Sequence, residues 1–547
     1  MTACRSGNAQ TVGQTSGLPA AIPPVLHALT DWHPEDALTG RPEVRPTLLV
    51  VTRCAPGNAR PGFYLAFAVA NGLARRRDVR SIFTYLAMAI VVLSPGAGLA
   101  QTLPDQIDAF LSALPDNTWS ALVENEAGSV TYYERDADTG LAPASNTKLF
   151  TTAAAFGLLG TNYAFETRVY YDGAFTNGAV TGNLSLVCEH DPTWNDTVFR
   201  SARAPLDHIA ARLKALGLTS VTSNVQCYGV CAYNFSSTGF LSATSTESKN
   251  ATAASAFMAA LRAWGIVVSG TNVGQTGFTV PGTLLYTHHS SDLAYQGKPL
   301  RLSTACIPLL KVSHNVMADL LCRHLGWKLG GEDSYSAGTP QVLDWLGHVA
   351  GIRTNGMVMN DGSGLSRDNR FSARQCIAVV RYMQAAFPAW EEGLPIGCVD
   401  GTLRRRFCGT DGEKEVHAKT GSLRTAISLS GYVNNRYDEQ RYLFSFIANR
   451  SPIDQSATRQ AIDNSVVLFD GPFRVVQPQV SWTNRAVTFS WASRPGLTYQ
   501  VQFKNTLSDP AWQTLGSNII ATGTTALGSD AAFGDVPQRF YRIYWVR

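Results

Sequence analysis

Two residues with the potential for nucleophilic chemistry, Ser145 and Lys148, stand three positions apart in the stretch PASNTKLFTT. A serine hydroxyl is a poor nucleophile unless a nearby base removes its proton. A lysine can be that base when burial or a second cation lowers its pKa. No other lysine of the sequence follows a serine at this spacing. Ser145 is therefore the candidate nucleophile and Lys148 its candidate base.

A second group of residues has the chemistry to bind a carboxylate. Lys419, Thr420 and Gly421 lie in EVHAKTGSLRTAISLSGYV, whose composition predicts a β-strand, and RYLFSFIANR after the turn NNRYDEQ predicts its antiparallel partner. A lysine and a hydroxyl on one strand can hold a carboxylate, while glycine lets the backbone approach a substrate closely. Taken alone, Lys419 is better explained as an exposed charge on a strand.

A third group is Ser313-His314-Asn315. These polar residues stand at the start of a predicted helix with an apolar stripe formed by Val312, Val316, Met317, Leu320 and Leu321. Helix capping alone would explain them. We do not assign His314 as a catalytic base, because Lys148 already fills that role.

The element that must position the first pair is a helix. SNTKLFTTAAAFGLLG is rich in alanine and leucine, begins with a serine of the capping type and stops at Gly160. Side chains three residues apart share one face of a helix. We therefore expect Ser145 and Lys148 to touch.

The order Ser-x-x-Lys, Ser-x-Asn, Lys-Thr-Gly is the signature of the penicillin-binding protein and serine β-lactamase superfamily. The long gap between Ser145 and Ser313 predicts an inserted domain. With DGSGLSR and DGTLRRRF following in order, the sequence resembles the low-molecular-mass class C penicillin-binding proteins, the D-alanyl-D-alanine carboxypeptidase/endopeptidase family (peptidase family S13).

This resemblance implies an α/β (α+β) fold in which a β-lactamase/transpeptidase-like domain carries an inserted domain. It implies a serine-type carboxypeptidase/endopeptidase that acts on the D-Ala-D-Ala end of peptidoglycan stem peptides through an acyl-enzyme at Ser145. β-Lactam antibiotics are implied as further ligands. The reaction would need no metal or organic cofactor.

The resemblance also implies a role for each motif residue. Ser313 would relay a proton to the leaving amine, and Asn315 would orient the substrate amide and Lys148. The terminal carboxylate would be held by Lys419 and by the residues that follow it, Thr420, Gly421 and Ser422. The backbone N–H groups of Ser145 and Ser422 would bind the oxyanion, where one such donor is typically worth ~10² to 10³ in rate. Asp361, Gly362 and Arg404 are interpreted as structural.

Composition predicts five segments along the chain. Residues 1–78 are expected to be disordered or to precede the true start, and residues 79–100 have the basic, apolar and small-residue order of a signal peptide. An N-terminal membrane anchor is the alternative, although the apolar run is short for a span. Residues 101–165 and 285–474 would form the discontinuous catalytic domain, residues 166–284 the inserted domain, and residues 478–547 a C-terminal all-β sandwich.

The number of cysteines is consistent with a protein that is exported from the cytoplasm. The sequence has ten cysteines, and a secreted chain of this kind is expected to contain disulfides. Cys398 and Cys408 are the first candidate pair because they are close in sequence. A zinc site formed by Cys188, His190, Cys227 and Cys231 is the less favoured alternative for those residues. The expected location is outside the cytoplasm, in the periplasm or cell envelope.

Other classes of function fit less well. The net charge is only +4, and no basic run is interleaved with aromatic residues, so nucleic acid is not an expected partner. A serine β-lactamase is the nearest rival, but no Glu-x-x-x-Asn segment that would activate water is evident. A non-catalytic cell-wall binding protein is a second rival, against which the intact motifs argue. The C-terminal module could attach the protein to the cell envelope, sort it or act as a spacer.

Overall fold

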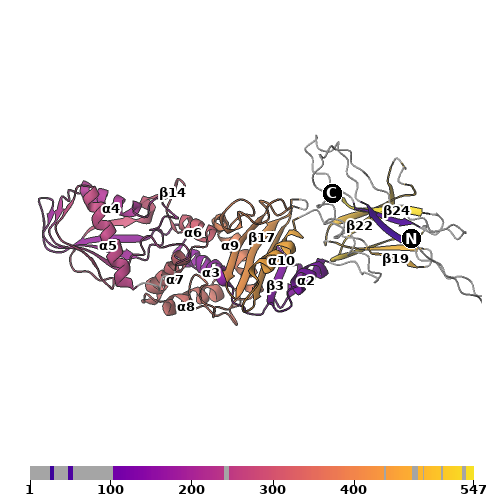
Figure 1. Cartoon of the computed structure of the whole chain (residues 1–547), viewed down its shortest axis with the longest axis horizontal. Coiled ribbons are helices and arrows are strands. Elements are labelled where there is room, and N and C mark those ends of the chain that lie inside the picture. Colours follow the sequence, from indigo (N-terminus) through magenta and orange to yellow (C-terminus); the bar gives the residue numbers. More distant parts are fainter. Residues whose placement is uncertain are drawn as a thin grey trace, which may run out of the picture. The chain divides into compact units, whose positions relative to one another are not determined.

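The computed structural model describes residues 25–29, 47–52, 103–239, 245–436, 439–470, 479–483, 486–493, 495–506, 509, 511–531 and 538–546. Two compact units divide the chain, one formed by Leu103–Phe473 and the other by Met1–Thr102 with Arg474–Arg547 (Figure 1). Among these described segments, no helix is long and apolar enough to cross a membrane. The signal peptide predicted at residues 79–100 lies outside the described residues.

A five-stranded antiparallel sheet is the centre of the larger unit. Its strand order is β16-β17-β18-β3-β4. The bounds are Val416–Leu423 (β16), Ala426–Asn434 (β17), Arg441–Asn449 (β18), Thr118–Asn125 (β3) and Thr131–Arg135 (β4). The sequence predicted one strand across the region of β16 and β17. The structure instead forms a tight hairpin, because Leu423 pairs directly with Ala426 and leaves two residues for the turn.

Helices cover both faces of this sheet (Figure 1). On one face, α2 and α10 share a hydrophobic core with the sheet, and on the other face α9 belongs to a second core. Their bounds are Leu103–Ser112 (α2), Gln455–Val467 (α10) and Ala373–Ala386 (α9). Because both faces are covered, β17 is buried along nearly its whole length and shows no alternation.

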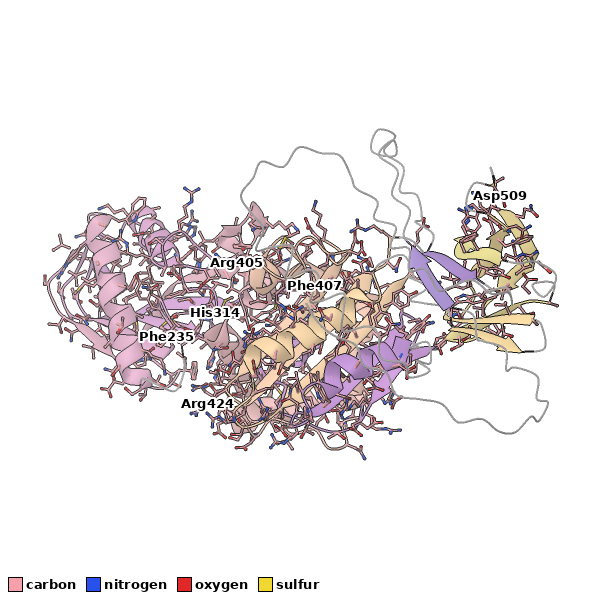
Figure 2. The ribbon with its side chains drawn as sticks, turned by 45° about the vertical axis from the view of Figure 1, so that its right-hand side comes forward. Phe235, His314, Arg405, Phe407, Arg424 and Asp509 are labelled. Carbon is pink, nitrogen blue, oxygen red and sulfur yellow. A yellow bond between two sulfur atoms is a disulfide. The ribbon has the colours of Figure 1, made fainter. Side chains whose placement is uncertain are left out.

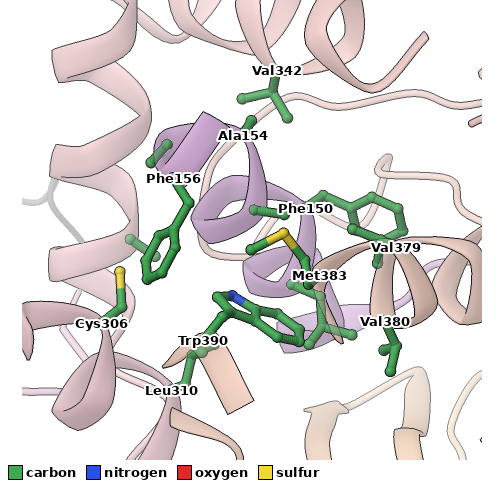
Figure 3. Close-up of a cluster of buried hydrophobic side chains, with 14 of the residues drawn as sticks. Phe150, Ala154, Phe156, Cys306, Leu310, Val342, Val379, Val380, Met383 and Trp390 are labelled. Carbon is green, nitrogen blue, oxygen red and sulfur yellow. The ribbon is translucent and has the colours of Figure 1, made fainter. Parts of the chain in front are cut away.

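Helix α3 (Thr147–Leu159) runs through the larger core, and the side chains from Thr147 to Phe156 are all buried. Figure 3 shows Phe150, Ala154 and Phe156 of this helix packed among side chains from neighbouring helices. Trp390 adds a polar contact, since its indole Nε1 donates to Thr152 Oγ1 at 2.9 Å. The neighbours are Leu302–Lys311 (α6), Asn315–Gly330 (α7), Tyr335–His348 (α8) and the 3₁₀ helix Pro388–Gly393 (η5). Burial on all sides holds α3 firmly in place.

The insertion between α3 and α6 is a layered α/β structure. Its main sheet has the order β12-β10-β8-β5-β13, with strands Asn272–Gly274, Val225–Val230, Leu184–Glu189, Glu166–Tyr171 and Thr283–His289. Four short strands form a second sheet, namely Phe175–Thr176 (β6), Ala179–Val180 (β7), Ser220–Val221 (β9) and Val267–Val268 (β11). Two helices, α4 (Ala204–Ala215) and α5 (Thr246–Ala263), share the core of the main sheet.

Three short elements follow β13 and lead back to α6. They are the 3₁₀ helix Ser290–Asp292 (η4) and the two-residue strands Ala294–Tyr295 (β14) and Lys298–Pro299 (β15). Ser290 fixes the junction, because its hydroxyl donates to Leu300 O and accepts from Phe165 N, at 2.7 and 3.0 Å. The two chain crossings between the insertion and the body that contains α3 and α6 therefore lie side by side.

The smaller unit contains two sheets, as expected for an all-β module at the C-terminal end. One has the order β19-β20-β23, with strands Gln479–Thr483, Ala486–Ala492 and Thr525–Asp530. The other has the order β1-β2-β24-β21-β22, with strands Val25–Leu29, Thr47–Thr52, Gln538–Val546, Thr498–Lys504 and Gln513–Ile520. Strands β1 and β2 fall within residues 1–78, where the sequence predicted an extension without structure. The rest of that extension lies outside the described residues.

Several aromatic residues of the smaller unit belong to its core. Trp491, Tyr499 and Tyr541 are fully buried. Trp512 is only half-buried, and the cationic groups of Lys504 and Arg542 lie over its ring.

Candidate active site

Ser145 and Lys148 lie where the 3₁₀ turn η2 (Ala144–Asn146) runs into α3. Lys148 Nζ is 3.0 Å from Ser145 Oγ, so the predicted contact is present. The sequence predicted Ser145 as the cap of the helix, but the N-cap position falls on Asn146. The Ser145 hydroxyl is engaged by Lys148 instead. Ser145 is half-buried and Lys148 fully buried, so the hydroxyl is the part of the pair that solvent reaches.

Lys148 makes three hydrogen bonds at the end of its side chain. Besides Ser145 Oγ, its Nζ contacts Asn315 Oδ1 at 2.8 Å and the Ser363 carbonyl oxygen at 2.5 Å. Those two oxygens can only accept hydrogen bonds. When Lys148 is a free base, its two remaining N–H groups satisfy these acceptors and its lone pair is left for the Ser145 hydroxyl. This arrangement is what a general base for Ser145 requires.

The pKa of Lys148 is lowered to about 8, chiefly because burial disfavours the charged amine. The charges of Asp319 and Asp361 act in the opposite direction and raise it. A free-base fraction is therefore present close to neutral pH. Among the described residues, these two acids are the ones whose charge acts on Lys148.

Asp361 holds the loop that presents the Ser363 carbonyl. Its carboxylate accepts from the backbone N–H groups of Gly364 and Ser366, at 2.7 and 2.6 Å, and from Asn369 Nδ2 at 2.9 Å. These contacts support the structural interpretation of Asp361 made from the sequence.

Asp319 was missed by the sequence analysis. It lies on α7, one turn after Asn315, and is only 2% exposed. Burial and the neighbouring Asp361 raise its pKa to about 7, while Lys148 opposes that rise. An acid between the apolar residues Met317 and Leu320 was the available signal in the sequence, since a buried acid is costly unless it has a partner.

Ser313 and Asn315 flank the turn between α6 and α7. Ser313 has a φ of 61°, a left-handed conformation that is uncommon for a residue with a side chain. His314 caps α7 by accepting from Met317 N through Nδ1, and it lies beside Phe235 (Figure 2). Burial lowers the pKa of His314 to about 4 and keeps it neutral. These contacts agree with our decision not to treat His314 as a base.

Lys419 joins the second and third motifs. It lies on β16, is fully buried, and its Nζ donates to Ser313 Oγ and to the Thr420 carbonyl oxygen, each at 2.8 Å. Burial and the nearby charge of Lys148 lower its pKa well below the usual value. The explanation of Lys419 as an exposed strand charge is therefore excluded.

The rest of the third motif borders solvent. Thr420 is half-buried and donates to Thr402 Oγ1 at 2.7 Å, while Ser422 is exposed. Arg459 of α10 donates to Ser422 Oγ at 3.1 Å and is itself held by Gln455. Arg459 brings a positive charge to the end of β16, and no motif in the sequence pointed to it.

Gly421 is required by a close approach between β16 and the turn that carries the nucleophile. A Cβ at this position would lie 2.2 Å from Ser428 Oγ and 2.6 Å from the Pro143 carbonyl oxygen. The sequence predicted that this glycine would allow a close approach to substrate. In the structure its first role is to let the strand contact the residues that precede Ser145.

Two disulfides are present among the described residues. The predicted pair Cys398–Cys408 encloses the 3₁₀ helix Gly401–Leu403 (η6), which carries Thr402. The second disulfide, Cys188–Cys231, uses two of the four ligands considered for a zinc site, and Cys227 is buried as a free thiol. That alternative is therefore incompatible with the structure.

The structure thus brings all three motifs into one site. One hydrogen-bonded group consists of Ser145, Lys148 and Asn315, and another consists of Ser313 and Lys419. The site can activate a hydroxyl and can offer cationic and hydroxyl groups to an anion. The oxyanion donors expected at the backbone of Ser145 and Ser422 stay a prediction.

Comparisons with known proteins agree with this description. Residues 103–232 and 236–469 match the D-Ala-D-Ala carboxypeptidase 3 (S13) family. A D-alanyl-D-alanine carboxypeptidase of an Actinomadura species is 28% identical over 485 residues, covering 69% of this chain and 88% of that protein. A penicillin-sensitive carboxypeptidase A of Dictyostelium discoideum is 31% identical over 221 residues, covering 39% of this chain and 40% of that protein.

A solved structure supports the fold. The crystal structure of penicillin binding protein 4 (dacB) from Haemophilus influenzae, in complex with a β-lactam, matches with a TM-score of 0.55 and 21% identity. The match covers 67% of this chain and 99% of that chain. At this level of identity the likeness concerns the fold.

Proposed function

This chain belongs to the D-Ala-D-Ala carboxypeptidase 3 (S13) family, and we propose that it is a serine-type, penicillin-binding peptidase that cleaves the D-Ala-D-Ala end of peptidoglycan stem peptides. The observation that carries the proposal is the contact between Lys148 Nζ and Ser145 Oγ at the meeting point of the three motifs. The fully buried amine has a pKa of about 8 and so can take the hydroxyl proton near neutral pH.

Acylation begins when Ser145 Oγ attacks the carbonyl carbon of the penultimate D-alanine. The O–C bond forms as Lys148 accepts the hydroxyl proton, and the carbonyl oxygen becomes an oxyanion. We assign the backbone N–H groups of Ser145 and Ser422 to that oxyanion, since such donors are worth most where negative charge develops. Asn315 keeps Lys148 aimed at the hydroxyl through its Oδ1 contact.

Collapse of the oxyanion breaks the C–N bond of the terminal residue. The leaving amine needs a proton, which we propose the Ser313 hydroxyl donates before it is reprotonated by Lys148. Ser313 Oγ accepts a hydrogen bond from Lys419 Nζ, so its own hydrogen is available for donation. The terminal carboxylate would be held by Lys419 and the hydroxyls of Thr420 and Ser422. An incoming carboxylate favours the charged form of Lys419, which burial alone disfavours.

Deacylation repeats these steps with water as the nucleophile. Lys148 would take a proton from the water, and Ser145 Oγ would leave the acyl carbon and be reprotonated. A β-lactam follows the same acylation, but its leaving nitrogen stays tethered to the acyl group and hinders the approach of water. We therefore expect a long-lived penicilloyl ester at Ser145.

Intact-protein mass spectrometry with benzylpenicillin tests this function. The full chain should gain one penicilloyl group that persists, and Ser145→Ala should gain none, because loss of a nucleophile within a catalytic unit typically costs on the order of 10⁶ in turnover. Persistent labelling of Ser145→Ala would refute the proposal. An adduct on the wild type that disappears within seconds would identify a β-lactamase instead.

Purified muropeptides then separate the two peptidase activities. Release of free D-alanine from pentapeptide stems indicates a carboxypeptidase, and cleavage of cross-linked dimers indicates an endopeptidase. If neither product forms while benzylpenicillin still labels Ser145, the site binds and acylates but peptidoglycan is not its substrate.

We further propose that the protein works outside the cytoplasm, in the periplasm or cell envelope. Disulfides such as Cys188–Cys231 and Cys398–Cys408 persist in oxidising compartments. Attachment to the envelope through the C-terminal module is a separate proposal. Sedimentation of a full chain with isolated cell walls, compared with a chain that ends before Val480, tests it.

A further inference from the structure

Three potential metal ligands converge at the base of the inserted domain. His208 lies on α4, His288 near the end of β13, and Asp292 in η4. One ligand atom from each residue lies within 4.8 Å of the others. His208 is distant in sequence from the other two, so the fold, and not local sequence, creates this cluster.

His288 is the least expected member of the cluster. Its side chain is 1% exposed, and neither ring nitrogen, including the Nδ1 that faces Asp292, makes a hydrogen bond to any residue that the structure describes. Its Nδ1 lies 3.3 Å from Asp292 Oδ2. Buried polar groups nearly always have a partner, so an imidazole left in this condition indicates a ligand.

We propose that His208, His288 and Asp292 bind a zinc ion, with solvent as the remaining ligand. Two imidazole nitrogens and one carboxylate oxygen suit zinc, whereas calcium and magnesium prefer oxygen ligands alone. Ligand atoms around a tetrahedral zinc ion are about 3.3 Å apart, as follows from bond lengths of about 2.0–2.1 Å. The distance between His288 Nδ1 and Asp292 Oδ2 already equals this value. His208 is half-buried and Asp292 exposed, so an ion can enter from solvent.

This zinc ion has no place in the peptidase reaction, whose groups are Ser145, Lys148 and their partners. Its position indicates a structural role. Asp292 belongs to η4, next to Ser290, which ties the two chain crossings together. An ion held between η4 and α4 would therefore fix the inserted domain to the junction with the catalytic domain.

The test uses the full chain without a histidine tag, stripped of metal by a chelator and dialysed. Cobalt(II) is the first probe, because zinc has no visible spectrum. One equivalent should produce visible absorption without the strong near-ultraviolet band of a thiolate ligand, and zinc should displace it. Calorimetric titration with zinc alone then gives the affinity and the stoichiometry, which should be one ion per chain.

Two variants remove single ligands with little change of shape, His208→Gln and Asp292→Asn. Each should weaken zinc binding at least tenfold, since changes outside the ligand set alone typically cost about 10- to 100-fold. His348→Gln is the matched control, because His348 is an exposed histidine beside an aspartate, on α8. The far-ultraviolet circular dichroism spectrum of each variant without metal verifies that it is folded.

Equal zinc affinity in wild type, His208→Gln and Asp292→Asn would overturn the proposal, as would a wild-type chain that binds no cobalt. A loss in both ligand variants that His348→Gln does not share would support it. Acylation by benzylpenicillin should be the same with and without zinc, so this result is independent of the proposed peptidase function.

Discussion

Replacing Asp319 by asparagine should move the pH dependence of acylation to lower pH. The negative charge of Asp319 raises the pKa of Lys148 against the effect of burial. Asparagine keeps the shape of the side chain but removes the charge. The Lys148 amine should then lose its proton at a lower pH than in the wild type.

The size of the effect follows from the pKa of about 8 that burial gives Lys148. At pH 7 about one tenth of the wild-type lysine is a free base, and at pH 9 about nine tenths is. The wild-type acylation rate should therefore rise about tenfold from pH 7 to pH 9 and then level off. In Asp319→Asn the acylation rate at pH 7 can exceed the wild-type rate by at most about tenfold. The reason is that complete deprotonation would raise the free-base fraction of Lys148 from about one tenth to one.

The two profiles should cross. A lysine with a lower pKa is a weaker base, so the plateau of Asp319→Asn at high pH should lie at or below that of the wild type. Asp319, whose own pKa is raised to about 7, carries its charge at the Lys148 midpoint near pH 8, where the midpoints of the two profiles are compared. A crossing separates a change in the Lys148 pKa from a general loss of activity, which would lower the whole profile.

The assay is stopped-flow or quenched mass spectrometry of benzylpenicillin acylation from pH 6 to pH 10, at saturating concentrations. At saturating benzylpenicillin the measured rate does not depend on binding of its carboxylate, so titration of Lys419, which we propose binds that carboxylate, should not affect the profile through binding. Asp344→Asn is the matched control, because this acid is exposed and paired with His348 on α8. A wild-type profile that is flat over this range, or a midpoint of Asp319→Asn above that of the wild type, would refute Lys148 as the base.

Four further outcomes are expected. Lys419→Ala should raise the KM for D-Ala-D-Ala peptides more than it lowers kcat, and an equal loss in both parameters would argue against carboxylate binding by this lysine. Gly421→Ala should impair acylation and lower the melting temperature, because the new methyl group meets the Pro143 carbonyl, and a variant with wild-type values would contradict this. A chain that ends before Val480 should keep its peptidase activity on soluble substrates, and a folded but inactive product would place the module in the site. Mature protein should begin at or near Gln101 by N-terminal sequencing, unless the preceding segment is retained as an anchor.

The sequence was sufficient to identify the motif residues as candidates because each motif combines particular residue types at a fixed spacing. Ser145 and Lys148 are joined by helix geometry alone, which is local and predictable. The grouping of Ser313 and Lys419 with them depended on the order of three motifs, each of which is weak alone. The predicted Cys398–Cys408 disulfide is present for a similar reason, since a short separation leaves few alternatives.

Residues that act through tertiary contacts could not be found in this way. Asp319 appears in the sequence as one acid in an apolar helix, and Arg459 as one of many arginines. Their relation to Lys148 and Ser422 exists only after α7 and α10 pack against the site. The hairpin between β16 and β17 was missed because its two turn residues, Arg424 and Thr425, are neither glycine nor proline, the residues that most clearly signal a turn.

The contacts of Lys148 also suit the role of base that we propose for it, for which burial of a lysine alone would not suffice. Burial alone would favour the free amine but leave its hydrogens without partners, at a cost in stability. Asn315 Oδ1 and the Ser363 carbonyl accept two hydrogens, and these acceptors are present in both protonation states. Only the contact with Ser145 reverses its direction when the proton moves. In the proposed reaction, proton transfer would therefore change only the hydrogen bond between Lys148 and Ser145.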